Sequence, residues 1–357
     1  MRKREYSLIG ICVLLVAALA LVLFRNSTHK TNPKLSGSTM GTSYTIQIAE
    51  RVSIKKLNAL LPMIEAELAE VNRQMSTWDP ESEISRFNHS DSTDPISVSE
   101  PFAEVVRRAL ELSKESNGTF DPTLEPLLTL WGFSSESTTS EVPSEEEILK
   151  AKALTGWHKI SVPSTSSLQK SEPQISLDLG AIAKGYGVDA VSNLLLENGF
   201  KNWYVEIGGE LQVYGKNSKG EPWKIGVQYP SPTAEFDRLK GTLQISSGAL
   251  ATSGDYRNYI EEDGQIFSHI LDPRTGRSVH STTASVSVYA PDCTLADGMA
   301  TGLFVMGPEE GLAWVEQTPN VEALFLLRGE KGEIIEKFSS GFLAATGYIP
   351  LPEDKSR

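Results

Sequence analysis

The sequence predicts an α+β fold, a single domain of mostly antiparallel sheets with packed helices. Three observations indicate this class. Helical apolar spacing appears at residues 54–72 and 102–115, most of the second half alternates apolar and polar residues over short segments, and turn residues separate those segments. Helices gathered in one part of a chain and strands in another are typical of an α+β domain.

The first half opens with a strand at Thr42–Ile48, where apolar and polar side chains alternate. The two helices follow. A Ser/Thr/Glu-rich loop at 134–144 and a Ser/Pro-rich loop at 162–173 then separate them from the next elements. A short apolar strand at 175–177 leads through a tight turn into a helix at 183–198.

The second half contains most of the expected strands. We expect them at 203–207, 211–214, 223–227, 243–246, 284–289 and 321–327. A hairpin turn is expected near Asp263 and Gly264, and a helix from Asp297 through Met306. No internal repeat is visible.

The N-terminus predicts a membrane anchor. Three basic residues, Arg2, Lys3 and Arg4, precede 17 apolar or weakly polar residues at 8–24, which span about 26 Å as a helix. Positive charge ahead of the run favours the cytoplasmic (inner) membrane, with the large domain on the periplasmic side. Residues 18–20 resemble a signal-peptidase site, which leaves a cleaved signal as the alternative. Cys12 lies inside the apolar run without a lipobox, so lipid attachment is not expected.

Three parts follow from this: a signal anchor with a short tether at 1–34, one large domain at 35–350, and a tail at 351–357. Residues 1–34 hold six basic residues and one acidic residue, so the rest holds 27 basic and 45 acidic residues, a net charge of about −18. Such a domain should not bind nucleic acid. Cys293 is the one cysteine outside the apolar run, so the large domain forms no internal disulfide.

Residues 178–186 carry the densest signal of a functional site. Gly180 lets the main chain approach a ligand, and the helix that follows presents unpaired amides and the positive end of its dipole to a phosphate. Lys184 would add a matching point charge. The alternative is structural, with Asp178 a helix cap and Lys184 a solvated charge.

Asp297 and Thr301 form a second signal. They are four residues apart on the expected helix, so their side chains share one face. A carboxylate and a hydroxyl suit Mg²⁺, which binds through hard oxygen ligands and substrate phosphates. The structural alternative is that Asp297 caps the helix and the Thr301 hydroxyl is packed in the protein interior.

Two polar clusters, at 252–258 and 268–276, flank the expected hairpin turn. His269 lies in the second cluster with Asp272 and Arg274, which predicts a proton acceptor tuned by its neighbours. A structural histidine is the alternative.

Further motifs follow the order of a known family. They are Gly-Ser-Thr-Met-Gly-Thr at 37–42, Met-Ser-Thr-Trp at 75–78, Glu-Ile-Ser-Arg-Phe-Asn at 83–88, Gly-Thr-Phe-Asp-Pro-Thr at 118–123, Leu-Trp-Gly-Phe at 130–133 and Val-Glu-Ile-Gly-Gly-Glu at 205–210. Together with 178–186, the clusters around His269 and 297–301, they resemble the FAD:protein FMN transferases, the ApbE family. The resemblance covers residues 35–347.

The resemblance implies a transferase that splits FAD at its pyrophosphate, attaches FMN by a phosphoester to a threonine or serine of a partner protein, and releases AMP. It also implies a tunnelling-fold-like, two-lobed domain with the nucleotide between the lobes. The positions that match the family's FAD contacts are Met40, Trp78, Thr119, Phe120, Asp121, Asp178 and Lys184. The positions that match its magnesium ligands are the side chains of Asp297 and Thr301 and the carbonyls of Ala181 and Ala300.

The two lines of reasoning agree. Phosphoryl transfer needs alignment and charge neutralisation, which a metal ion, a lysine and a helix terminus provide. We therefore expect FAD as substrate, Mg²⁺ as cofactor, Asp297 and His269 as catalytic residues, and His269 as the base beside FAD. The alternatives are an FAD pyrophosphatase that uses water as acceptor and a non-enzymatic flavin-binding protein. By resemblance, the acceptor would be a subunit of a sodium-pumping NADH:quinone reductase or a related electron-transport complex.

Overall fold

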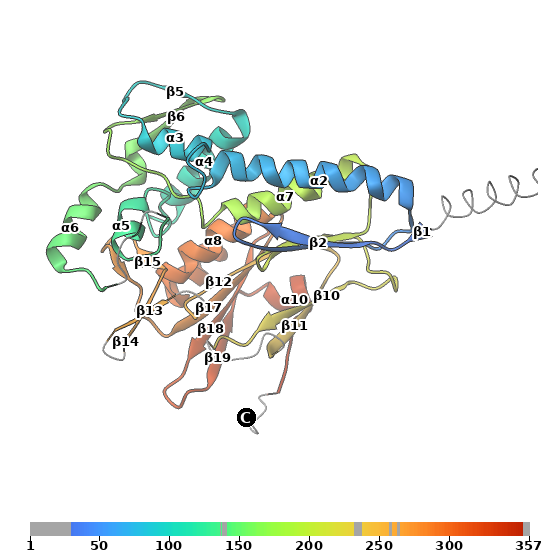
Figure 1. The fold of residues 1–357 in the computed structure, drawn as a ribbon. Helices are drawn as coiled ribbons and strands as arrows, with labels where there is room; N and C mark the ends of the chain where they lie inside the picture. The colour runs from blue at the N-terminus through green and yellow to red at the C-terminus, as the bar shows by residue number, and fades with distance from the viewer. Residues whose placement is uncertain are drawn as a thin grey trace, which may run out of the picture.

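The computed structural model describes residues 30–135, 137, 141–231, 238–256, 259–262 and 265–352. Its centre is an eight-stranded sheet in the order β19–β18–β17–β12–β9–β8–β3–β2, in which all neighbouring strands are antiparallel (Figure 1). These strands are β2 (Lys34–Thr39), β3 (Thr42–Ile48), β8 (Trp203–Ile207), β9 (Glu210–Tyr214), β12 (Ser247–Gly254), β17 (Thr283–Ala290), β18 (Glu322–Arg328) and β19 (Ile334–Phe338).

Smaller sheets surround the large one. Two have three strands: β10 (Trp223–Gln228), β11 (Leu239–Ile245) and β20 (Ile349–Pro350); and β5 (Ile96–Ser97), β7 (Ser167–Lys170) and β6 (Ile160–Ser164). The others are pairs: β1 (Lys30–Thr31) with β4 (Val52–Ser53), β13 (Tyr259–Glu262) with β14 (Gln265–Ser268), and β15 (Leu271–Asp272) with β16 (Arg277–Ser278).

The helices gather mainly on one face of the large sheet. They are α2 (Ile54–Met75), α3 (Glu83–His89), α4 (Glu100–Glu115), α5 (Glu125–Leu130), α6 (Glu145–Ala153), the 3-10 turn η1 (Trp157–Lys159), α7 (Ala183–Glu197), α8 (Cys293–Met306), α9 (Pro308–Val315) and α10 (Phe342–Thr346). Helices α7 and α8 pack side by side on the sheet, and α2 runs along α7 (Figure 1). The main apolar core lies between these helices and the sheet.

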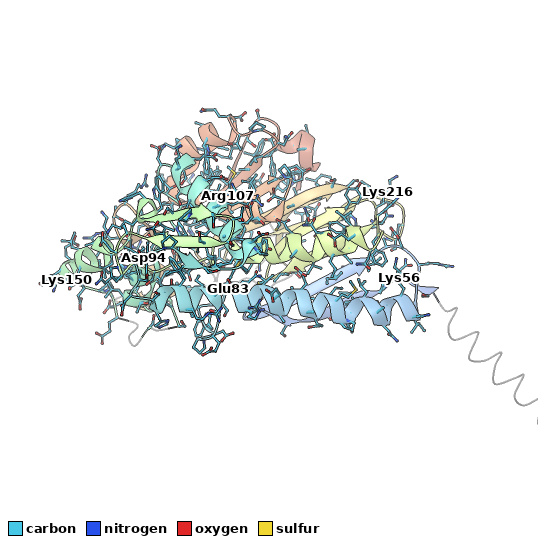
Figure 2. The ribbon with its side chains drawn as sticks, turned by 90° about the horizontal axis from the view of Figure 1, so that it is seen from above. Lys56, Glu83, Asp94, Arg107, Lys150 and Lys216 are labelled. Carbon is cyan, nitrogen blue, oxygen red and sulfur yellow. The ribbon has the colours of Figure 1, made fainter. Side chains whose placement is uncertain are left out.

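A second core fills the opposite face of the sheet, beneath β10, β11 and α10. Central strands of the sheet are therefore buried on both faces, as the burial of nearly every residue of β17 shows. The α+β prediction, with mostly antiparallel sheets and packed helices in one domain, is confirmed. Seen from above, Lys56 and Lys216 lie at one end of the molecule and Lys150 lies at the other (Figure 2).

The expected strand at 175–177 is wrong. This segment is buried and extended, but it joins no sheet. The side-chain amide of Asn88 replaces a neighbouring strand, because it donates to the carbonyl oxygen of Leu177 and accepts from the Leu177 amide, both at 2.8 Å. The next amide, that of Asp178, donates to the carbonyl of Pro122 at 2.8 Å. The apolar residues of this segment therefore predicted its burial correctly, but they did not predict which group would bond its main chain.

Two other expectations differ from the structure. The segment 162–173, expected as a loop, contains the end of β6 and all of β7, which pair as a hairpin with an irregular register. The helix expected from Asp297 begins four residues earlier, at Cys293, because Asp292 caps it by accepting from the Leu295 amide at 2.9 Å. Asp297 is therefore inside the helix rather than at its cap.

The expected anchor at 8–24 and the turn residues Asp263 and Gly264 lie outside the described residues. Strands β13 and β14 on either side of that turn do pair, with Glu262 opposite Gln265. None of the helices in the described ranges combines the length and apolar character needed to cross a bilayer.

Candidate functional site

A cavity of about 520 Å³ lies where α7 and α8 meet the large sheet and the loops around it. Chain segments that are far apart in sequence line it. The predicted site residues that line it are Met40, Trp78, Thr119, Phe120, Asp121, Asp178, Ala181, Lys184, His269, Asp297 and Thr301. Ala300 does not line the cavity and is fully buried on α8. The two motifs that the sequence singled out, 178–186 and 297–301, therefore meet in space.

The floor of the cavity is the contact between α7 and α8. One carboxylate oxygen of Asp297 accepts from the Gly185 amide at 2.9 Å, and the other lies 3.6 Å from the Lys184 ammonium. The helices can approach this closely because residue 185 is glycine. A Cβ atom there would lie 2.2 Å from the carbonyl oxygen of Cys293.

No side-chain cap bond is made at Ile182, where helix α7 begins. The expected unpaired amides are largely absent, because the Ala183 amide donates to the Leu179 carbonyl at 2.8 Å and the Gly185 amide donates to Asp297. The carboxylate of Asp178 instead accepts from the Gly180 amide at 2.9 Å, within the turn. The helix-cap alternative for Asp178 therefore does not describe this structure. Burial raises the pKa of Asp178, while the Gly180 bond and the charge of Lys184 oppose the rise.

Lys184 lies between two carboxylates. Its ammonium is 3.4 Å from Glu210 as well as 3.6 Å from Asp297. Burial disfavours the charged form, but the two carboxylates outweigh it and raise the pKa of Lys184 above its usual value. Lys184, whose side chain is 29% exposed, is therefore a cation held in the cavity floor by two carboxylates.

Glu210 is a site residue that the sequence reasoning missed. It is 5% exposed, lines the cavity, and has one oxygen, Oε2, that is buried without a hydrogen-bond partner in the described structure. Burial raises the pKa of this carboxyl group, against the opposing charge of Lys184. The sequence shows Glu210 at the end of the 205–210 motif, but only the fold places it beside Lys184.

Asp189 is a second residue that the sequence did not indicate. Its carboxylate accepts from the amides of Cys293 and Thr294, each at 2.8 Å, and from the Thr294 hydroxyl. It therefore ties α7 to the first turn of α8. Burial raises the pKa of Asp189 to about 6. This contact fixes the two helices on which the cavity floor depends.

One wall is formed by the turn between β2 and β3. Its two central residues, Met40 and Gly41, both have positive φ, at 48° and 69°, as a tight hairpin turn requires. A positive φ is unusual for methionine. It directs the chain so that Met40 packs against Gly187 of α7, where a Cβ atom would lie 2.7 Å from the Met40 methyl carbon.

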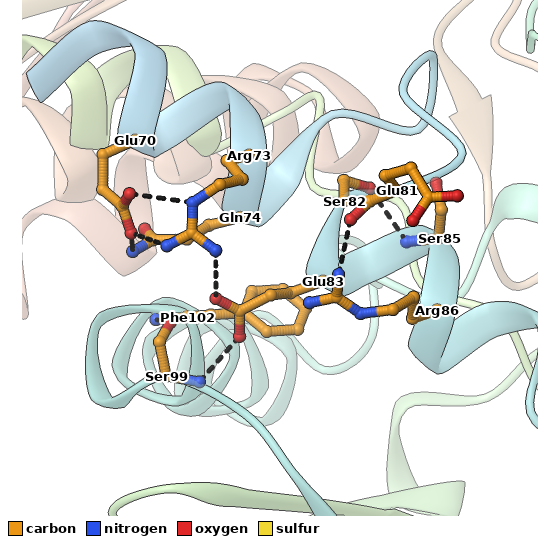
Figure 3. Close-up of polar contacts among 10 residues, drawn as sticks. All are labelled: Glu70, Arg73, Gln74, Glu81, Ser82, Glu83, Ser85, Arg86, Ser99 and Phe102. Carbon is orange, nitrogen blue, oxygen red and sulfur yellow. Dashed lines mark hydrogen bonds and ion pairs between the residues drawn. The ribbon is translucent and has the colours of Figure 1, made fainter. Parts of the chain in front are cut away.

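Trp78 lies on the rim and is 75% exposed. The loop that carries it is nevertheless held at both ends. Ser82 caps α3 through the Ser85 amide and donates to the Ser76 carbonyl at 2.7 Å. Figure 3 shows how Glu83, 6% exposed, links the helices around this loop by accepting from the Ser99 amide at 2.6 Å and facing Arg73 at 3.9 Å. An exposed indole on a fixed loop suits stacking on a planar ring.

The segment 119–121 forms another wall. Thr119 is 2% exposed, and its hydroxyl oxygen is buried with no hydrogen-bond partner in the described part of the chain. Asp121 accepts from the hydroxyl and amide of Thr123 and from the Trp157 amide. Burial raises the pKa of Asp121, and these bonds oppose the rise. Asp121 thus shapes the wall through its neighbours, while Thr119 has an unused polar group.

His269 lines the cavity directly after β14 and is half-buried. Its ring makes a T-shaped contact with the Phe133 ring, with centroids 6.3 Å apart and planes at 71°. The guanidinium of Arg274 donates two hydrogen bonds of 2.9 Å to the Asp272 carboxylate.

Thr301 lines the cavity from α8, and its hydroxyl forms a hydrogen bond of 3.0 Å with the hydroxyl of Ser253.

Together these groups define a class of protein: an α+β protein with an oxygen-rich cavity that combines a lysine, the start of a helix and acidic side chains. Comparison with known proteins identifies the family. A model of the ApbE family matches residues 40–325. The chain belongs to the ApbE family.

Curated relatives and solved structures agree. The FAD:protein FMN transferase of Vibrio cholerae is 40% identical over 89% of this chain and 94% of its own, and that of Haemophilus influenzae is 37% identical over 93% and 97%. The solved flavin transferase ApbE of Vibrio cholerae superposes with a TM-score of 0.80 at 38% identity, covering 88% of this chain and 99% of its own. The ApbE protein of Thermotoga maritima gives a TM-score of 0.77 at 30% identity over 88% and 99%.

Proposed function

We propose that this flavin transferase uses Mg²⁺ to cleave FAD at its pyrophosphate and attaches FMN to a threonine or serine hydroxyl of a partner protein. The observation that supports this proposal is the meeting of Lys184, Asp297, Thr301 and His269 in one cavity. These groups supply the charge neutralisation and the proton acceptor that phosphoryl transfer requires.

In the proposed step, the acceptor hydroxyl oxygen forms a bond to the phosphorus of the FMN half, and the bond from that phosphorus to the bridging oxygen breaks. AMP leaves with the bridging oxygen. His269 takes the hydroxyl proton, while Lys184 offsets negative charge on the phosphate oxygens.

The residues in the cavity fit a magnesium ion. Asp297, Thr301 and Ala181 line the cavity, and a carboxylate, a hydroxyl and a main-chain carbonyl are hard oxygen donors. Ala300 also belongs to this proposed set, through its carbonyl. When bound, Mg²⁺ would neutralise charge on the pyrophosphate oxygens.

The described residues contain no group of three or more histidine, cysteine or acidic side chains that could hold a metal ion. We therefore propose that oxygen atoms of the substrate complete the coordination shell of the magnesium ion. FAD and the metal would then bind together, with Met40, Trp78, Thr119, Phe120, Asp121 and Asp178 holding the rest of the nucleotide.

The acceptor and the location are also part of the proposal. We propose that the anchor at 8–24 holds the enzyme in the inner membrane with its domain on the periplasmic side. The acceptor would then be an exposed threonine or serine in a subunit of a sodium-pumping NADH:quinone reductase or a related electron-transport complex.

The decisive experiment is mass spectrometry of candidate acceptor subunits after incubation with this protein, FAD and Mg²⁺. We expect a covalent addition equal to one FMN on a threonine or serine, with one AMP released. Chelation of the metal should stop both. AMP and free FMN formed equally with and without acceptor would instead indicate an FAD pyrophosphatase, and FAD bound but left intact would indicate a flavin-binding protein.

A further inference from the structure

One end of the molecule differs in charge from the rest. Residues 35–357 carry 27 basic and 45 acidic residues. Yet five exposed basic side chains gather where α2 begins and α7 ends. We call this surface the basic end; its residues are Arg51, Lys55, Lys56, Lys201 and Lys216.

Hydrogen bonds join the segments of the basic end. The ammonium of Lys56 donates to the Asn198 carbonyl at 2.9 Å, which brings the start of α2 to the end of α7. The amide of Lys201 donates to Glu50, and the amide of Lys216 donates to the Asn202 side chain at 2.8 Å. Figure 2 shows Lys56 and Lys216 at the same end of the molecule.

Carboxylates in these segments do not cancel the charge. They are Glu50, Glu197 and Glu221. Glu50 already accepts from the Lys201 amide and from the Asn202 side chain at 3.1 Å. With Lys219, these segments hold six basic residues and three acidic ones, whereas acidic residues outnumber basic ones in the domain as a whole.

Apolar side chains are exposed in the same place. Ile54 at the start of α2 is 40% exposed, Leu196 near the end of α7 is 44% exposed, and Tyr214 at the end of β9 is 43% exposed. Lysines interleaved with exposed aliphatic and aromatic residues are typical of surfaces that lie on an anionic bilayer.

The chain also enters the domain at this end. Strand β1, which starts at Lys30, pairs with β4 immediately before Ile54. The apolar run ends at Phe24, so five residues separate it from β1. Five extended residues reach at most about 18 Å. An anchored domain must therefore keep this end close to the lipid.

We propose that the basic end docks on anionic phospholipid headgroups and holds the domain in one orientation, an inference that rests on the proposed peptide anchor. Helix α2 has 22 residues and is about 33 Å long. The basic end lies at its start, and the loop of Trp78 follows its end. Docking therefore turns the cavity away from the lipid, toward the soluble part of a membrane-bound acceptor.

The test uses the full chain in lipid vesicles with a nitroxide-labelled lipid as quencher. Cys12→Ser leaves buried Cys293 as the one remaining cysteine. A fluorescent dye is then placed by Lys216→Cys at the basic end or by Lys150→Cys at the opposite end, in phosphatidylcholine with and without phosphatidylglycerol. We expect strong quenching at position 216, at least about twice that at 150, and a rise with phosphatidylglycerol.

Charge reversal supplies the matched control. In the Lys216→Cys protein, Lys55→Glu with Lys201→Glu should lower quenching by about half or more, because both changes replace attraction by repulsion. Lys114→Glu with Lys331→Glu changes the net charge equally at exposed sites elsewhere and should leave quenching unchanged. FAD cleavage in detergent should be the same in all these proteins.

The outcomes separate the two proposals. If the chain floats with vesicles but positions 216 and 150 are quenched equally, or if lipid charge and charge reversal have no effect, docking is wrong and the anchor stands. If the chain does not float with vesicles, the anchor proposal fails and docking fails with it. Neither result alters the assignment of the cavity.

Discussion

The floor and the rim of the cavity are built in opposite ways. On the floor, Asp297 is 3% exposed and bonded to the Gly185 amide, and Lys184 lies between two carboxylates. On the rim, Trp78 is 75% exposed and His269 is half-buried. The comparison indicates that the groups proposed to act on the pyrophosphate are fixed by helix packing. The groups that would meet FAD and the acceptor stand on loops, where a protein substrate can reach them.

The largest expected effect comes from the floor. Asp297→Asn keeps the size of the side chain but removes its charge, so FMN transfer should fall on the order of 10³-fold or more. AMP release at saturating Mg²⁺ measures the rate. Asp292→Asn makes the same change at the cap of the same helix, outside the cavity, where asparagine also caps, and should keep the rate within about threefold. Normal transfer by Asp297→Asn would show that the floor is not the metal site.

The second largest effect is expected for His269, the proposed base on the rim of the cavity. His269→Ala should lower the transfer rate by 10²- to 10⁴-fold, the usual range for a positioned general base, with FAD affinity nearly unchanged. FAD binding measured by fluorescence separates the two quantities. His280→Ala removes a histidine from a neighbouring cavity and serves as control. A loss of affinity as large as the loss of rate would make His269 a binding residue.

A third experiment isolates the helix contact beneath the floor. The pKa of Asp189 is about 6 in the folded protein, against 3.8 as the ordinary value, so the folded state holds this proton more tightly than the unfolded chain. Its contribution to stability is therefore fully present below pH 4 and is lost as pH rises through 6. The free energy of unfolding should lose on the order of 2 kcal/mol from this group over that window.

Asp189→Asn should remove that pH dependence and lower stability above pH 6, because the ionised Asp189 accepts from three donors there and one amide oxygen cannot. Denaturant unfolding at several pH values from 4 to 7 gives the comparison. If the free energy of unfolding changes with pH equally in both proteins, the pKa of Asp189 is not raised by folding.

The smallest effect belongs to the exposed rim. Trp78→Ala should weaken FAD binding about tenfold, as expected for a lost aromatic stack, without changing the melting temperature by more than a degree or two. Leu149→Ala, at another exposed apolar position, is the control. A clear drop in melting temperature would show that Trp78 belongs to the structure rather than to the site.

The fold was predictable where local pattern and tertiary environment agree. Strands β3 and β8 begin and end where their alternation indicates, and α7 begins at Ala183 as expected. The strand expected at 175–177 failed because Asn88, 89 residues earlier, supplies its hydrogen bonds. Periodicity carries no information on such a partner.

In the candidate site, too, local sequence predicted some features and tertiary packing decided the others. The sequence by itself determined which residue types are present: Gly180 and Lys184 at a helix start, and a carboxylate and hydroxyl one helical turn apart at Asp297 and Thr301. Only the tertiary structure decided which of them meet. Glu210 lies beside Lys184 and Ala300 does not line the cavity, because helix packing sets those positions through contacts such as the close approach at Gly185. Spacing along a chain fixes a face of a helix, whereas packing decides what that face meets.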